Sequence, residues 1–212
     1  MLYTHNKYGL YISCGRGWLD QYYNDLWIYD FSEDMWHKMD QTYLSMVPEP
    51  RYGVVGGIYP AYEYIGDTKS NLFLSLGRSQ YVSYGNLFTY SFTDLRGLNG
   101  IWQHIYTDFL AGPFGFTYPH ARSFASSAMI SREELLIFGG CLSGGLTGGP
   151  CPSQDSWVFS YSKNKWEQVD STCISPRAHS SMASLVSDGY RQSAVLFSGL
   201  EKDRSILMVA RK

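Results

Sequence analysis

The run Leu135-Leu136-Ile137-Phe138-Gly139 decides the fold, because similar runs recur along the chain. The other copies are Leu10 to Gly15, Leu72 to Gly77 and Ala194 to Gly199. The closing glycines are spaced by 62, 62 and 60 residues at Gly15, Gly77, Gly139 and Gly199. Such even spacing indicates an internal repeat of about sixty residues.

Each of the first three runs is followed by a segment with aromatic residues at every second position. These residues are Trp27, Tyr29 and Phe31, then Phe88, Tyr90 and Phe92, then Trp157, Phe159 and Tyr161. A period of two places the three rings on one face of a strand. A tryptophan follows each segment, namely Trp36, Trp102 and Trp166. Strand, turn and strand predict an antiparallel hairpin.

An arginine-bearing element opens each unit after the first, with Arg51, Arg122 and Arg177. It leads into candidate strands at residues 52–57, 126–130 and 181–186. No stretch has a 3.6-residue apolar period, so we expect almost no helix. Four-stranded units repeated around an axis are the building plan of β-propellers.

Together these elements resemble the kelch motif, which has an Arg-bearing first strand, a second strand ending in Gly-Gly, and a later Tyr and Trp. The third unit matches best, with Arg122, Gly139-Gly140, Tyr161 and Trp166 in order. A tryptophan-aspartate propeller fits less well, because no Trp-Asp pair closes the Trp-bearing strand. The resemblance implies an all-β, kelch-type β-propeller of about four four-stranded antiparallel blades, the first and last incomplete.

The units are expected at about residues 1–47, 48–110, 111–173 and 174–212, within one kelch-repeat region spanning 1–212. The first unit is expected to lack its first strand, and the fourth to end after a third strand at residues 205–209. Kelch-type propellers close with more blades than four, and open ends expose strand edges. We therefore expect further blades outside this chain. A closed four-blade ring is the alternative.

The recurring residues have an expected structural role. The unit glycines Gly15, Gly77, Gly139, Gly140 and Gly199 would permit close backbone approach near the axis. The rings, with Trp36, Trp102 and Trp166, would fill the space between neighbouring sheets. We expect Arg51, Arg122 and Arg177 to bond carbonyls of the adjoining blade.

Composition narrows the class of protein. Charged residues make up 17% of the 212 residues, and aromatic residues another 17%. A chain this aromatic and this weakly charged can bury a core, which excludes disorder. No apolar run is long enough for a membrane-spanning helix, and residues 1–14 lack the order of a secretory signal. A net charge of −2 without a basic cluster argues against nucleic acid as a partner.

Of the four cysteines, only Cys141 and Cys151 are close in sequence, at the ends of a Gly-rich loop. Two ordinary thiols are favoured over a disulfide. The compartment stays open: the cytoplasm is slightly favoured, and a bridge between the two would favour an extracellular one. The loop itself lacks the Lys-Ser/Thr ending of a phosphate cradle, so it is interpreted as a flexible hairpin loop.

Two groups of residues are candidate binding sites. Arg16 and Arg78 follow the unit glycines of consecutive units, so they are expected at the same end of neighbouring strands. Two guanidinium groups there could hold a carboxylate, although two solvated arginines would look the same in sequence. Tyr59, Tyr62 and Tyr64 are expected in a Pro-containing loop, where tyrosines could contact a partner or fold back on their own blade.

No catalytic residues are predicted. Some relatives in the wider kelch-like group are copper oxidases, but the five histidines have no metal-ligand spacing with one another or with cysteine. No cofactor or metal is predicted. The leading hypothesis is a non-enzymatic scaffold that binds another protein or an acidic peptide through inter-strand loops. The alternative is a galactose-oxidase-like or other carbohydrate-acting propeller enzyme with an axial metal site.

Overall fold

The computed structural model describes residues 1–5, 8–39, 41, 46–59, 71–93, 99–106, 118–142, 149–185 and 193–201. Within these ranges the chain is all-β, with four antiparallel sheets and one short 3-10 helix, Trp18–Asp20. In these ranges no helix is long and apolar enough to cross a membrane.

The strands follow sequence order within every sheet. Sheet one contains β1 (Leu2–His5), β2 (Gly9–Arg16), β3 (Tyr22–Asp30) and β4 (Met35–Lys38). Sheet two contains β5 (Val55–Tyr59), β6 (Asn71–Ser75), β7 (Leu87–Phe92) and β8 (Gly100–Ile105). Sheet three contains β9 (Ser126–Met129), β10 (Glu134–Phe138), β11 (Ser156–Ser160) and β12 (Lys165–Val169). Sheet four contains β13 (Ser181–Leu185) and β14 (Ser193–Phe197).

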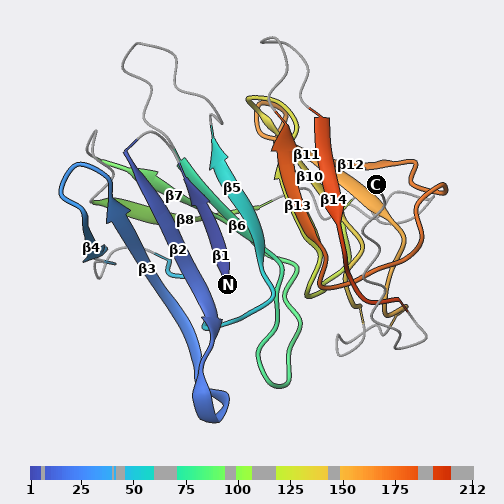
Figure 1. Ribbon diagram of the computed structural model, residues 1–212, viewed down its shortest axis with the longest axis horizontal. Helices are drawn as coiled ribbons and strands as arrows, with labels where there is room; N and C mark the ends of the chain where they lie inside the picture. The colour runs from blue at the N-terminus through green and yellow to red at the C-terminus, as the bar shows by residue number, and fades with distance from the viewer. Residues whose placement is uncertain are drawn as a thin grey trace.

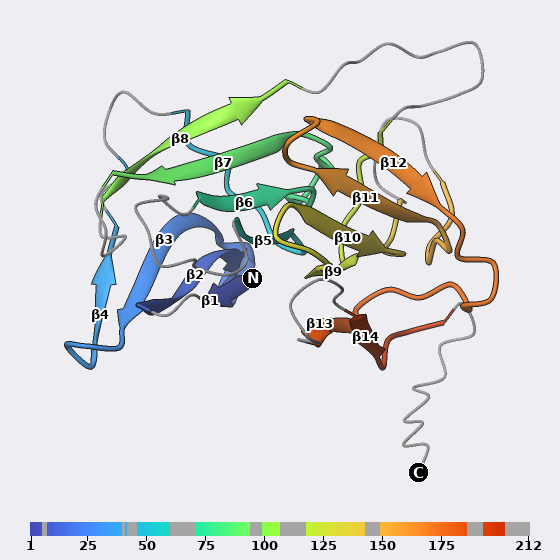
Figure 2. The same ribbon diagram turned by 90° about the horizontal axis from the view of Figure 1, so that it is seen from above.

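The four sheets lie one after another around a common centre (Figures 1 and 2), with the first strand of each sheet innermost. Strand β1 contacts β5, β5 contacts β9, and β9 contacts β13. Among the described strands, the row ends at sheet one on one side and at β13–β14 on the other (Figure 2). Because the strands follow the same order in each sheet, equivalent residues of successive units lie at the same end of their sheets.

Two apolar clusters fill the spaces between the sheets. One joins Leu26 and Ile28 of sheet one to Phe88, Tyr90 and Trp102 of sheet two, among others. The other joins sheet two to sheet three, where the rings of Phe73 and Phe159 are stacked with centroids 5.2 Å apart. Sheets two and three therefore present the aromatic rows of their third and fourth strands to the preceding sheet.

Sheet one differs from expectation in two ways. It has a complete set of four strands, because β1 pairs with β2 along Leu2 to His5. The prediction that unit one lacks its first strand is wrong. Residues 2–5 form this strand without the Arg-bearing element that opens the other units. Trp36 is also 44% exposed, whereas Trp102 and Trp166 are buried, because no described sheet precedes sheet one. The predicted third strand at 205–209 lies outside the described residues.

The register of the third unit also needs correction. Two successive residues with positive φ stand near the end of the second strand in each sheet. They are Cys14-Gly15 within β2, and Leu76-Gly77, Gly139-Gly140 and Ser198-Gly199 directly after β6, β10 and β14. The counterpart of Gly15 and Gly77 is therefore Gly140, one residue later than the sequence alignment placed it. Gly139 stands where other units use Cys, Leu or Ser, so the run of two glycines hid the true register.

Cys141 and Cys151 form a disulfide bond, which corrects the preference for two free thiols. Residues 143–148, which form most of the predicted flexible hairpin loop, lie outside the described residues. Cys14 is buried and Cys173 is exposed, both as free cysteines.

Candidate functional site

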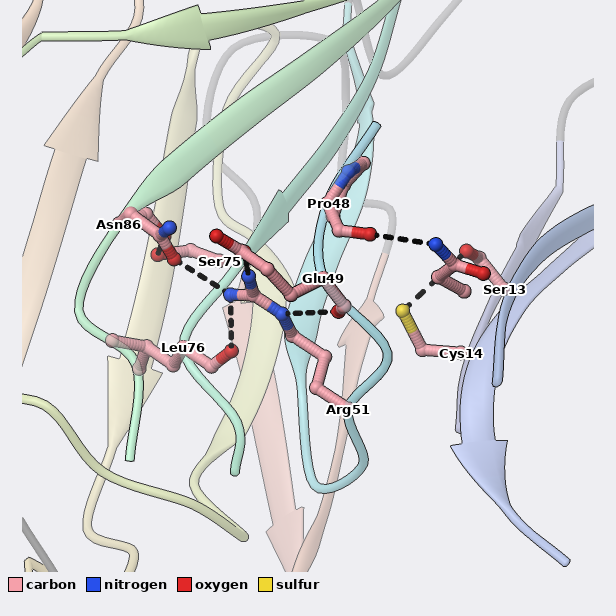
Figure 3. Close-up of polar contacts among 9 residues, drawn as sticks. Ser13, Cys14, Pro48, Glu49, Arg51, Ser75, Leu76 and Asn86 are labelled. Carbon is pink, nitrogen blue, oxygen red and sulfur yellow. Dashed lines mark hydrogen bonds and ion pairs between the residues drawn. The ribbon is translucent and has the colours of Figure 1, made fainter. Parts of the chain in front are cut away.

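Sheets two, three and four each contain a buried or half-buried arginine whose guanidinium group bonds backbone carbonyls of its own sheet. This set of bonds is called the arginine clamp. The guanidinium group of Arg51 donates from Nε to the carbonyl of Glu49 at 3.0 Å and from an Nη atom to the carbonyl of Leu76 at 3.3 Å. The same Nη atom bonds Oδ1 of Asn86 at 2.6 Å (Figure 3). Arg51 is fully buried and also lies 3.8 Å from the ring centroid of Tyr84.

Arg122 repeats this arrangement with a carboxylate in place of the amide. Its Nε donates to the carbonyl of His120 at 3.0 Å, and one Nη donates to the carbonyl of Gly139 at 3.0 Å. Two Nη atoms bond the two oxygens of Asp155 at 2.6 and 2.8 Å, a bidentate ion pair. Burial tends to raise the pKa of Asp155, but bonds from Arg122, Ser153 and Trp157 bring it down to about 2. Arg177 forms the clamp of sheet four, with bonds to the carbonyls of Ser175 and Ser198.

The expected role of these arginines is corrected in one respect. Their guanidinium groups bond carbonyls of their own sheet, not those of the adjoining one. Their backbone carbonyls make the link to the preceding sheet: Gly15 N–H donates to Arg51 at 2.8 Å, Gly77 to Arg122 at 2.8 Å, and Gly140 to Arg177 at 2.9 Å. The side-chain bonds of the clamp hold the arginine in place, and its backbone carbonyl then accepts a bond from the preceding sheet.

In the first unit, Asp25 is the counterpart of Asn86 and Asp155, the side chains that accept bonds from the clamp arginines. The indole of Trp27 donates to Oδ2 of Asp25 at 2.8 Å, as the indole of Trp157 donates to Oδ2 of Asp155 at 2.6 Å. Sequence reasoning missed Asp25, Asn86 and Asp155, although each stands two residues before the first ring of an aromatic row, and that spacing could have identified them.

A cavity of about 670 Å³ opens at the inner ends of the sheets, and all four units line it. The first unit contributes half of the lining residues, among them Arg16, Tyr23 and Asp25, and the segments before β5, β9 and β13 contribute the other half. The residues Gly53, Phe124 and His179 occupy equivalent positions, each two after a clamp arginine and each with φ near +60°. They form a chain of backbone bonds, from Phe124 N–H to Gly53 at 3.0 Å and from His179 N–H to Phe124 at 3.0 Å.

Aromatic rings form one part of the cavity wall. The rings of Phe124 and His179 are stacked with centroids 3.7 Å apart, and Tyr52 meets Phe124 edge-on at 5.4 Å. Burial lowers the pKa of His179 and that of the Met1 amino group. Both groups are therefore biased toward their neutral forms, which leaves Arg16 as the permanent cation among the lining residues.

Arg16 and Arg78 lie near the same pair of tyrosines. Tyr22 and Tyr52 are stacked with centroids 5.5 Å apart, and the Arg16 guanidinium carbon lies 5.7 Å from the Tyr52 ring. The backbone of Arg78 pairs with that of Tyr52. Burial raises the pKa of Tyr22, as does Asp20, whereas both arginines lower it, which places both charges near that hydroxyl. Of the two, Arg16 lines the cavity and also forms an ion pair with Asp20.

The predicted tyrosine loop is placed differently. Tyr59 ends strand β5 and does not lie in a loop, and its ring stacks on Tyr161 of sheet three with centroids 4.0 Å apart. Burial raises the pKa of both hydroxyl groups. Tyr59 therefore packs between sheets, because the period of the strand continues through it. Tyr62 and Tyr64 lie outside the described residues.

Among the described residues, one group of three His, Cys, Asp or Glu side chains has ligand atoms close together, within 4.8 Å. It consists of Asp30, Glu33 and His37. Asp30 accepts bonds from Ser32 and from the Glu33 N–H, so it stabilises the turn between β3 and β4. This turn lies at the opposite end of β3 from the cavity.

Comparison with known proteins gives a likeness of fold only. No protein-family profile matches the chain, and no curated protein matches it. Solved structures do match, in 116 chains. One is described as the structure of YjhT, with a TM-score of 0.53 and 13% sequence identity over 85% of this chain and 54% of that chain. The chain thus spans about half the length of that structure.

Proposed function

We propose that the chain is a kelch-type β-propeller scaffold, without enzymatic activity, that binds an acidic segment of a partner protein in the cavity at the inner ends of its sheets. The propeller assignment is supported by the innermost position of the first strand in each sheet. It is further supported by the arginine and glycine bonds that recur from sheet to sheet.

The observation that carries the binding proposal is the position of Arg16 in the wall of a cavity that all four units build. A cavity of about 670 Å³ falls within the range of about 300–1,000 Å³ that is typical of ligand sites. A guanidinium group and aromatic rings are the side chains most enriched where protein partners bind tightly. Because Asp25 lines another part of the wall, an acidic ligand would lie on the side of Arg16 and Tyr52.

The ion pair between Arg16 and Asp20 fits a site that exchanges partners. Both side chains are about half exposed, so solvent screens the pair and it contributes little to stability. A ligand carboxylate can therefore replace Asp20 at small cost. Arg78 stands beside the same tyrosine pair and adds to the positive potential there.

The test is binding of an oligoglutamate peptide by isothermal titration calorimetry at low and high salt. We expect binding that weakens with salt, and at least a tenfold loss in Arg16→Glu/Arg78→Glu. Arg132→Glu/Lys163→Glu is the control matched in charge, since both side chains are exposed and lie on turns of sheet three. Unchanged binding by the double variant would exclude this site. Stoichiometric copper in the purified protein would contradict the non-enzymatic assignment.

A further inference from the structure

Sheet one presents an aromatic face that no described residue covers. This front face consists of Tyr29, Phe31 and Trp36. The ring of Tyr29 lies 5.2 Å from Trp36 and 6.3 Å from Phe31, so the three form one patch. Phe31 is 51% exposed and Trp36 is 44% exposed.

The equivalent residues of the next two sheets are buried by the sheet that precedes them. In sheet two, Tyr90, Phe92 and Trp102 pack in a cluster with residues of sheet one. In sheet three, Phe159 and Trp166 pack in a cluster with residues of sheet two. The fold thus shows what kind of surface covers a front face: the opposite face of another sheet of the same repeat.

Sheet four carries such a surface with nothing described against it. This back face consists of Leu185, Val195 and Phe197, which lie on one side of β13 and β14 because their exposed positions alternate with less exposed ones in register. All three are about half exposed or more. Val195 occupies the strand position of Phe73, the residue that stacks on Phe159 in the next sheet.

We propose that two copies of this chain pair head to tail, each packing its front face against the back face of the other. Val195 of one copy would then meet Tyr29 of the other, as Phe73 meets Phe159 within one chain. The two contacts are identical and are related by a twofold axis, which closes the pair.

The area of the two faces supports a second copy as the occupant. At roughly 100 Å² for each half-exposed side chain, the six side chains of one contact bury about 600 Å². Two contacts then bury ~1,200 Å², the lower end of stable interfaces.

The test is the mass of the full chain in solution, measured by light scattering over a range of concentrations. We expect wild type to be a dimer, and Trp36→Glu and Phe197→Glu each to be monomeric. Trp18→Glu, at a side chain that is 86% exposed outside both faces, is the control and should remain a dimer. Circular dichroism checks folding, and Phe31→Glu replaces Trp36→Glu if that variant does not fold.

Mixing the two face variants separates head-to-tail pairing from symmetric pairing. One intact front face and one intact back face remain in the mixture, so weak heterodimers held by a single contact of about 600 Å² should appear only at the highest concentrations. A monomeric wild type would overturn the proposal, as would a back-face variant that still dimerises. Assembly that continues beyond two copies would contradict a closed pair.

Discussion

Replacing Asp155 by Asn tests whether charge in the arginine clamp stabilises the fold. The substitution keeps the shape of the side chain and one acceptor oxygen for Arg122, but it removes the negative charge and sets an NH2 group opposite donors that now bond the second oxygen. Sheet two carries an amide at this position, Asn86, but its Arg51 also forms an ion pair with Glu49. The part of the loss that depends on pH therefore reports the ion pair between Arg122 and Asp155.

The magnitude follows from the pKa of Asp155, which lies at about 2 against an ordinary value of 3.8. A difference of nearly two pKa units corresponds to about 2.5 kcal/mol of stability. Because the folded pKa is depressed, this contribution is fully present above about pH 4 and is lost as the pH falls toward 2. The Asp155 side chain is only 21% exposed, so screening by solvent reduces it little.

Urea unfolding followed by tryptophan fluorescence measures the effect at pH 7, 5, 4 and 3. We expect Asp155→Asn to lose about 2.5 kcal/mol at pH 7 and at pH 5, and progressively less at pH 4 and pH 3. Glu167→Gln is a control for general charge effects, since Glu167 is exposed and its contact with the exposed Lys165, at 4.0 Å, is screened by solvent. If the difference between wild type and Asp155→Asn were the same at pH 7 and pH 3, the ion pair would not be its source.

Two further predictions concern the backbone. Gly77→Ala should lose at least about 2 kcal/mol, because residue 77 has φ +92° and an added Cβ would lie 2.7 Å from its nearest neighbour. Gly15→Ala, where that distance is 3.7 Å, should lose about half as much, and equal losses in urea unfolding would refute the steric argument. Cys141→Ser/Cys151→Ser opens a loop with a sequence separation of 10 and should lower thermal stability by about 2–3 kcal/mol, whereas Cys173→Ser should not. A melting temperature unchanged in the double variant would show that the bridge adds no stability.

The all-β class and the order of strands in sheets two and three could be predicted from the sequence. Rows with a period of two, such as Phe88, Tyr90 and Phe92, indicate a strand with one face packed on another sheet. This pattern lies within a few neighbouring residues, so the sequence alone shows it. The register around Gly139 could not be predicted, because two adjacent glycines satisfy the pattern equally well. The pairs of positive φ angles and the hydrogen bond from Gly140 to Arg177 distinguish them in the structure.

The site was only partly accessible to sequence reasoning. Arg16 and Arg78 follow equivalent glycines, so their common neighbourhood could be anticipated from the repeat alone. The cavity wall at Phe124 and His179 could not, because it depends on a backbone with positive φ at residues that are not glycine. The sequence predicts a loop at Tyr59 because Pro60 follows it, whereas strand β5 includes Tyr59 and ends there.

The central claim is that the same backbone bond, from a unit glycine to the clamp arginine of the next unit, recurs between each pair of neighbouring sheets, three times along the chain. Scalar couplings through hydrogen bonds, measured by NMR on the deuterated full chain, test this directly. The account predicts couplings from the amide of Gly15 to the carbonyl of Arg51, from Gly77 to Arg122, and from Gly140 to Arg177. Couplings within the sheets without these three would contradict it, because the sheets would then be packed in some other way.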